Sequence, residues 1–246
     1  MTQPVLYCAE LLYTGMGGAQ APGGVVVVGS TVAATGHPDT LRRQYPQARE
    51  EAAGIIAPLP VNAHTHLDMS TYTFKPLPYF QWIPEVVIPQ QSLRTPQAAQ
   101  AGAALVHKYG TAAVGDIVWS PAIMETLLQS DLQGTLYFEV IGPFPEQANE
   151  RFAAVRAQLE RWRAMERPGL RVGLSPHTPF NVSHRLMRLV AEYAQGKAFP
   201  SRFMWLNTQL KLSFSGLGAA PCGRTACRSF IQSGLQKSLA VSQQQT

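Results

Sequence analysis

The chain has few charged residues, few cysteines and no long apolar run. Charged residues make up 14% of its 246 residues and hydrophobic residues 46%, a balance typical of globular proteins. Apolar runs such as residues 25–28 fall far short of the roughly 20 residues that cross a bilayer. The first residues, MTQPVLYCAELLY, lack the basic and apolar segments of a secretory signal. We therefore expect a cytoplasmic protein with no membrane partner.

The three cysteines exclude a disulfide framework. Cys8, Cys222 and Cys227 cannot all pair within one chain, and a reducing compartment keeps such thiols free. Cys222 and Cys227 also lack the spacing and the histidine partners of a zinc module. We therefore look for metal ligands among other residues.

Patterns of apolar, turn-forming and charged residues divide the chain into three parts. Residues 1–54 contain short apolar stretches separated by glycine-rich turns, which predict a small β-sandwich-like domain. Residues 55–196 alternate strands with helices, which predicts an α/β domain of βαβ units around a parallel sheet. Residues 197–246 contain no acidic residue, six Lys and Arg, and no clear period, so we expect an aberrant or disordered basic tail.

Four pairs of strand and helix are expected in residues 55–196. The strands are predicted at residues 55–66, 111–119, 135–141 and 170–175. The first helix should begin after Thr95 as N-cap, with Pro96 at its first position, and end before Gly110. The other three helices are predicted to open at Ser120, near Glu146 and at Ser183.

Two histidines follow the first of these strands, in the run VNAHTHLDMS. Residues two apart on a strand face the same way, so His64 and His66 should project together from its end. Imidazole suits zinc, iron or nickel, but a catalytic zinc-type site needs at least three protein ligands. The pair therefore predicts half of a metal site. A bare HxH can also arise by chance, with both histidines hydrogen-bonded in a loop.

The wider run APLPVNAHTHLDMS, followed by the β/α order, resembles the amidohydrolase superfamily, whose first barrel strand ends in such a metal motif. A second run, SPHTPFNVS, is similar to the strand-four segment of the aminohydrolase branch, which includes chlorohydrolases and deaminases of adenosine-like and aminofutalosine-like compounds. The resemblance covers most of residues 1–196. It implies that residues 55–196 form the first half of a β/α (TIM-like) barrel, strands one to four, beside the small N-terminal domain.

The resemblance also assigns candidate site residues. It implies that His64 and His66 are metal ligands and that His177 contacts the substrate, although His177 could instead cap a loop. Barrel enzymes place catalysis at the C-terminal ends of their strands, where Asp116 and Glu139 are also expected. Each carboxylate could bind substrate or hold a loop, and Glu139 is the better substrate candidate.

Aromatic residues in the segment after the first strand form a second set of candidates. Trp82, with Tyr72 and Phe80, could cover the flat ring of a substrate, and packing within a long loop would explain them as well.

The chemistry implied by the resemblance is hydrolysis of a small molecule. A divalent metal, zinc first with iron or nickel as alternatives, lowers the pKa of a water molecule, which attacks the carbon of a C–N bond. The implied reaction is deamination of a cyclic amidine or purine-type compound, with aminodeoxyfutalosine-type substrates as the nearest prediction. No nucleic acid is expected as a partner.

The family pattern also requires histidines on strands five and six and an aspartate on strand eight. This chain has no histidine after His184 and no acidic residue after Glu192. We therefore expect the chain to be truncated and inactive as it stands.

A change of reading frame near Gly196 would account for these absences. When residues 203–208 are reread with the third base of each codon and the first two bases of the next, the genetic code permits His-Val-Ala-Glu-His. That run is the family pattern for strand five. The hypothesis is a frameshift, either genuine or a sequencing error.

Two alternatives stay open at this point. His177 could join His64 and His66 in a site that works within this chain, although four strands of a barrel would leave sheet edges exposed. A non-catalytic remnant could also bind nucleic acid or anionic membrane through its basic tail. Six positive charges that do not cluster are a weak signature of that function.

Overall fold

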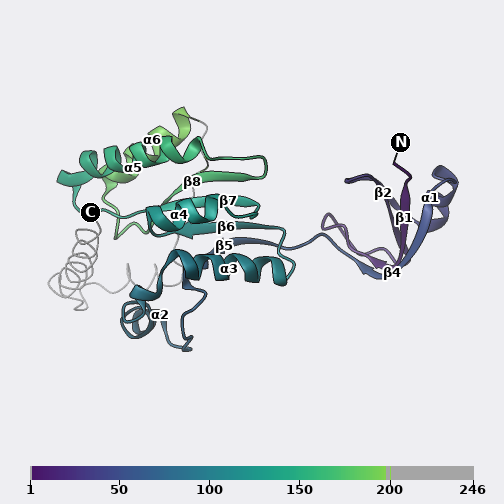
Figure 1. Cartoon of the computed structure of the whole chain (residues 1–246), viewed down its shortest axis with the longest axis horizontal. Coiled ribbons are helices and arrows are strands. Elements are labelled where there is room, and N and C mark those ends of the chain that lie inside the picture. Colours follow the sequence, from purple (N-terminus) through teal and green to yellow (C-terminus); the bar gives the residue numbers. More distant parts are fainter. Residues whose placement is uncertain (1, 198–199, 201–246) are drawn as a thin grey trace. The chain divides into compact units, whose positions relative to one another are not determined.

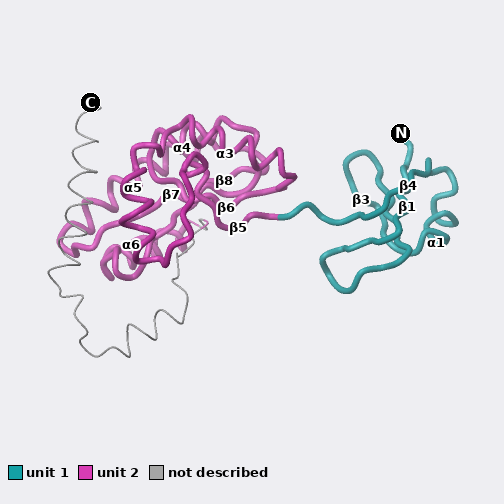
Figure 2. Tube along the Cα trace, turned by 90° about the horizontal axis from the view of Figure 1, so that it is seen from below, with its two compact units in different colours: residues 1–60 teal, residues 61–246 magenta. Residues whose placement is uncertain are grey.

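The computed structural model describes residues 2–197 and Pro200. It divides the chain into two compact units, Met1–Pro60 and a second that begins at Val61 (Figure 2). Sequence patterns predicted the boundary at Gly54. The predicted basic tail lies outside the described residues, apart from its residues 197 and 200.

The first unit is one four-stranded sheet backed by a helix. Its strand order is β3-β2-β1-β4, in which β1 and β4 are parallel and the other pairs antiparallel. Leu6, Val26 and Leu41 form the core between the sheet and the helix, so a helix takes the place of the second sheet of the predicted sandwich. The elements are β1 (Val5–Leu12), β2 (Gly23–Val28), β3 (Thr31–Gly36), α1 (Pro38–Gln44) and β4 (Arg49–Ile56).

The described part of the second unit contains four parallel strands in the sequential order β5-β6-β7-β8, with helices packed on the sheet (Figure 1). This arrangement confirms the predicted α/β class and its βαβ units. The strands are β5 (Val61–Thr65), β6 (Ala113–Val118), β7 (Gly134–Val140) and β8 (Leu170–Pro176). The helices between and after them are α3 (Pro96–Lys108), α4 (Pro121–Leu128), α5 (Ala148–Arg163) and α6 (His184–Gly196).

Side-chain caps begin three of these helices where the sequence predicts. Thr95 Oγ1 accepts a hydrogen bond from the Ala98 amide at 3.1 Å, and Pro96 occupies the first helical position of α3. Ser120 caps α4 and Ser183 caps α6 in the same way, at 3.4 and 3.3 Å. Gly110 follows the end of α3 with φ of 68°, a conformation that glycine adopts without strain.

The predicted first strand is divided between the two units. Ile55 and Ile56 end β4, where they pair with Leu11 and Leu12 of β1, and the chain crosses four residues before β5 begins at Val61. An unbroken apolar run suggested one strand, because a run without alternation does not show where one strand ends.

The segment between β5 and α3 is built of short helical turns. It contains η1 (Leu67–Met69), α2 (Tyr79–Trp82), the π-helical turn η2 (Ile83–Val87) and η3 (Gln91–Leu93). Sequence patterns predicted only a long aromatic-rich segment here.

The core of the second unit lies between the sheet and its helices. Leu159 and Trp162 of α5 are fully buried, and the Trp162 ring lies 4.9 Å from that of Phe138 in β7. Beyond α6 the chain returns to the sheet, because the Pro200 carbonyl accepts a hydrogen bond from the Leu174 amide at 3.0 Å. Within the described part of the chain, no helix combines the length and apolarity that a membrane span requires.

Candidate metal-binding site

Parallel strands bring the candidate residues to one edge of the sheet. His66 follows β5 directly, His177 follows β8, and Glu139 is the penultimate residue of β7. Asp116 lies two residues before the end of β6 and is paired in register with Thr65. The carboxyl ends of parallel strands share an edge, so these side chains gather where barrel enzymes hold their active sites.

His64 and His66 lie close to each other, as their spacing predicts. Their ring centroids are 5.4 Å apart and their planes are inclined at 66°. His64 is exposed, and its amide donates a hydrogen bond to Asn62 Oδ1 at 3.3 Å. His66 is half-buried, and its Nδ1 atom is buried with no hydrogen-bond partner among the described residues. A buried ring nitrogen without a partner is available as a ligand atom.

The surroundings of His66 keep its ring neutral. Burial lowers the pKa of His66 to about 4; the Glu139 carboxylate opposes this shift, whereas Arg94, His64 and His177 add to it. A metal ligand must be the neutral imidazole, so no proton has to leave at neutral pH. The two histidines therefore fit a divalent metal as two of its ligands. Among the residues that the structure describes, no group of three or more His, Cys, Asp or Glu side chains is arranged to hold an ion.

Glu139 and His177 form a buried pair. His177 Nδ1 and Glu139 Oε1 are hydrogen-bonded, and the Glu139 side chain is only 3% exposed. Burial alone would raise the pKa of Glu139, but the hydrogen bond with His177 and the positive charge of Arg94 hold it below its usual value. The Glu139 carboxylate therefore orients the His177 ring, and the other nitrogen of that ring, Nε2, is left for a further contact.

Asp116 holds the backbone that follows the two histidines. Its Oδ1 atom accepts a hydrogen bond from the Leu67 amide at 2.8 Å, and its Oδ2 atom is buried without a partner among the described residues. Burial raises the pKa of Asp116 to about 8, with a contribution from the nearby Asp68; the Leu67 amide and Arg94 act in the opposite direction. The sequence left two roles open for Asp116, a substrate contact and a contact that holds a loop. The structure shows the loop contact.

Asp68 and Arg94 form a buried ion pair that sequence reasoning missed. Arg94 Nε lies 2.7 Å from Asp68 Oδ2, and the two side chains are 7% and 1% exposed. The guanidinium carbon of Arg94 also lies 4.8 Å from the centre of the Trp119 ring. The only signal in the sequence was an aspartate two residues after the HxH motif, and nothing local pointed to its partner 26 residues later.

The aromatic candidates differ in how they are placed. Phe80 is 57% exposed, whereas Trp82 and Tyr72 are half-buried and each holds a buried polar atom without a partner among the described residues. Tyr79, which the sequence did not single out, has a raised phenol pKa. Burial and the charge of the Glu139 carboxylate cause this shift. Tyr79 therefore belongs with the residues around the Glu139 and His177 pair.

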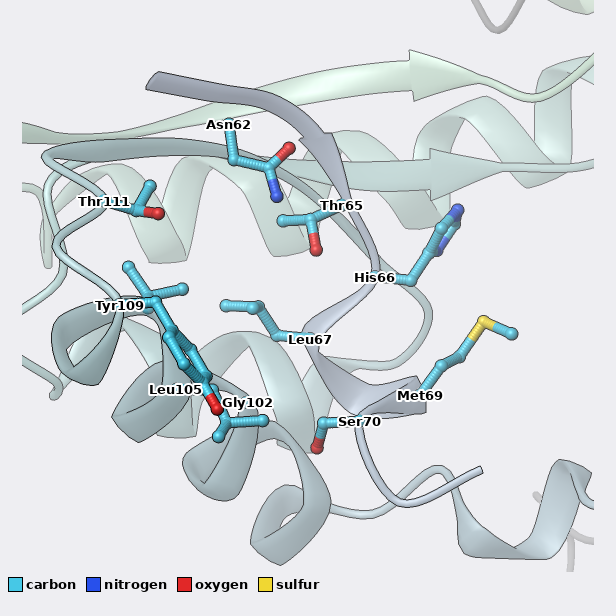
Figure 3. A pocket seen from close by; sticks show the side chains of 11 residues that line it. Asn62, Thr65, His66, Leu67, Met69, Ser70, Gly102, Leu105, Tyr109 and Thr111 are labelled. Carbon is cyan, nitrogen blue, oxygen red and sulfur yellow. The ribbon is translucent and has the colours of Figure 1, made fainter. Parts of the chain in front are cut away.

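A pocket lies between β5 and α3 (Figure 3). His66, Leu67 and Ser70 line it from the strand side, and Leu105 and Tyr109 line it from the helix. His64, Glu139 and His177 are not among its lining residues, so this pocket does not bring the candidate site residues together.

In sequence the chain is similar to known deaminases. Residues 23–48 match the imidazolonepropionase-like composite domain of bacteria. The chain is 62% identical over 218 residues to the aminodeoxyfutalosine deaminase of Deinococcus radiodurans, a match that covers 88% of this chain and 52% of that protein. It is 24% identical over 141 residues to the 5'-deoxyadenosine deaminase of Methanococcus vannielii, covering 54% of this chain and 33% of that protein.

Solved structures show the same fold. Helicobacter pylori aminofutalosine deaminase in complex with methylthio-coformycin aligns with a TM-score of 0.69 at 20% identity, over 81% of this chain and 50% of that one. The zinc complex of atrazine chlorohydrolase from Arthrobacter aurescens aligns with a TM-score of 0.62 at 13% identity, over 88% of this chain and 56% of that one. These neighbours are TIM-barrel amidohydrolases, so the described strands correspond to part of such a barrel.

The extent of the match differs between the two proteins. The chain spans about half the length of the Deinococcus relative. Because 88% of the chain is more than its first 196 residues, the match also includes part of residues 197–246. Sequence similarity, structural neighbours and the placement of the histidines together confirm the predicted resemblance: the chain is a homologue of an aminodeoxyfutalosine deaminase and has the fold of the amidohydrolase superfamily.

Proposed function

We propose that this chain carries the first part of the active site of a metal-dependent aminohydrolase. The observation that carries the proposal is the histidine pair, His64 and His66, at the carboxyl end of the first parallel strand, with a buried unpartnered nitrogen and a neutral ring at His66. The 62% identity to a deaminase supports the same conclusion. The reaction proposed is the hydrolysis of a C–N bond other than a peptide bond, by deamination of a purine-type compound.

The proposal gives a role to each of the candidate site residues. His64 and His66 hold the metal, with zinc first and iron or nickel as alternatives, and the bound metal would supply a nucleophile from water at neutral pH. His177 contacts the substrate through Nε2, because Glu139 occupies its Nδ1. Trp82 contributes an aromatic surface, and its unpartnered indole N–H is free to donate to a polar substrate atom.

The substrate class follows from the relatives. The curated deaminases that match are named for aminodeoxyfutalosine and for 5'-deoxyadenosine. The solved deaminase is titled as a complex with methylthio-coformycin. We propose a substrate of this kind, with an exocyclic amine on a purine-type ring, and aminodeoxyfutalosine as the first compound to test.

A reading-frame change near Gly196 is proposed as the source of the remaining ligands, and the match to the Deinococcus relative, which extends past residue 196 in the present frame, counts against it. The rereading of residues 203–208 as His-Val-Ala-Glu-His would supply a further histidine ligand. Sequencing the gene across codons 190–210 tests this directly. A restored frame would give a complete enzyme, whereas a confirmed frame would favour the alternative of a non-catalytic remnant that keeps His64 and His66.

The function itself is tested in the frame-restored chain. We expect metal analysis to find bound metal in the restored protein and in a His107→Ala control, and little in a His64→Ala/His66→Ala double variant. His107 is a matched control because it is an exposed histidine on α3, paired with Asp131 at 2.8 Å. Ammonia release from aminodeoxyfutalosine should follow the metal content. Deamination that survives loss of both histidines would refute the proposal.

The other candidate functions have less support. A working site of His64, His66 and His177 is disfavoured, because no group of three or more His, Cys, Asp or Glu side chains is arranged to hold an ion among the described residues. Binding of nucleic acid or membrane by the basic tail rests on residues outside the described part of the chain.

A further inference from the structure

The segment that follows the histidines is held by contacts from several elements. The Leu67 amide donates to Asp116 of β6, and Ser70 Oγ donates to the Ala98 carbonyl of α3 at 2.6 Å. Asp68 is held by Arg94, at the end of the turn that precedes α3. Two of these three contacts use buried carboxyl groups, and the one on Asp68 is paired with the Arg94 guanidinium.

Arg94 is the cation that the buried carboxylates share. Its Nε is bonded to Asp68, and its charge also acts on Asp116 and Glu139, whose pKa values it lowers. Removing it would leave Asp68 as an uncompensated buried charge.

The planar shape of the Arg94 guanidinium matters as well as its charge. The guanidinium lies over the Trp119 ring at 4.8 Å, while its Nε faces the Asp68 carboxylate. A planar group can stack on a ring and hydrogen-bond in its own plane at the same time, and the ammonium of lysine cannot. Trp119 directly follows β6, so this contact ties Arg94 to the strand that carries Asp116.

We propose that Arg94 is a positioning residue, which holds the segment after His66 through Asp68 so that the two histidines present their rings to one metal ion. The proposal rests on the proposed function, because it takes His64 and His66 to be metal ligands. Arg94 itself touches neither the metal nor the substrate. Residues that orient metal ligands in this way typically affect metal affinity about 10- to 100-fold.

The experiment is a cobalt(II) titration of the full chain, followed by the visible absorption of the bound ion. We expect Arg94→Met to weaken cobalt binding by at least about 10-fold and Arg94→Lys to restore part of the loss, because lysine keeps the charge but not the stacking. Arg188→Met is the control, because Arg188 is an exposed arginine of α6 whose nearest acid is Glu192 at 3.8 Å. It should leave the affinity unchanged within about twofold.

A double variant keeps the test valid if Arg94→Met does not fold. Asp68→Asn/Arg94→Gln removes both charges and so leaves neither of them buried alone. We expect it to fold, as judged by circular dichroism, and to bind cobalt more weakly, with a changed absorption spectrum. Cobalt affinity and spectrum equal to wild type in any folded Arg94 variant would overturn the positioning role. Absence of cobalt binding in the wild type would instead refute the proposed function.

Discussion

Replacing Gly102 by alanine should destabilise the second unit, although alanine is the better helix former. Gly102 lies inside α3 with its backbone against η1, and a Cβ built there would lie 2.4 Å from the Leu67 carbonyl oxygen and 3.0 Å from its carbon. In an open helix the change would gain about 1 kcal/mol. Here the obstacle is backbone, which no side-chain rotation can relieve, and overpacking of this kind costs up to about 3 kcal/mol. We expect a net loss of about 2 kcal/mol.

Urea unfolding followed by tryptophan fluorescence measures this loss of free energy of unfolding in the second unit alone. The four tryptophans all lie after residue 60, so their signal reports on the second unit alone. Ala101→Gly, an exposed site on the same helix, is the control and should lose about 1 kcal/mol through helix propensity. A Gly102→Ala protein more stable than wild type would refute the argument that α3 and the segment after His66 are in close backbone contact.

Three further predictions concern the same unit. Burial raises the pKa of Asp116 to about 8 from an ordinary 3.8, so the folded protein binds the extra proton between these values. The stability contributed by Asp116 should therefore fall as pH rises from about 4 to about 8, by at most about 1.4 kcal/mol per pH unit, whereas His66, whose pKa is lowered to about 4, acts in the opposite direction below about pH 6.5. The difference in the free energy of unfolding between wild type and Asp116→Asn, from urea titrations at several pH values, isolates the Asp116 contribution. A difference that does not change with pH would refute the raised pKa of Asp116. Ser120→Ala removes the cap of α4 and should lower the free energy of unfolding by about 1 kcal/mol, whereas Ser120→Asp should restore it. Trp162→Ala empties the centre of the core and should cost about 3 to 5 kcal/mol; a loss below 1 kcal/mol would mean that Trp162 is not packed as described.

Local patterns predicted the helices and strands of the second unit well. Thr95, Ser120 and Ser183 each begin a helix in the structure, because a cap depends on a hydrogen bond that spans only three residues. The helix predicted from Glu146 begins instead at Ala148, after the 3-10 turn Pro145–Gln147, where no side chain caps it. Without a cap the sequence contained no signal for the first residue.

The histidine pair was predictable for the same reason. A spacing of two residues on a strand places His64 and His66 on one side, whatever the rest of the chain does. The gathering of Glu139 and His177 needed one further step, the inference of parallel strands from alternating elements. The sequence by itself therefore determined the order of strands and helices in the second unit, three of the four helix starts, and the placement of the histidine pair, the proposed half of a metal site.

Tertiary structure decided how that half of the site is supported. Arg94 reaches Asp68 across 26 residues, and Asp116 reaches the Leu67 amide across 49. Such contacts depend on the path of a loop and on the packing of α3 against η1, for which no local pattern carries a signal. The division of the predicted first strand, with Ile56 paired to β1, was decided in the same way, because pairing partners distant in the sequence determine where a strand ends.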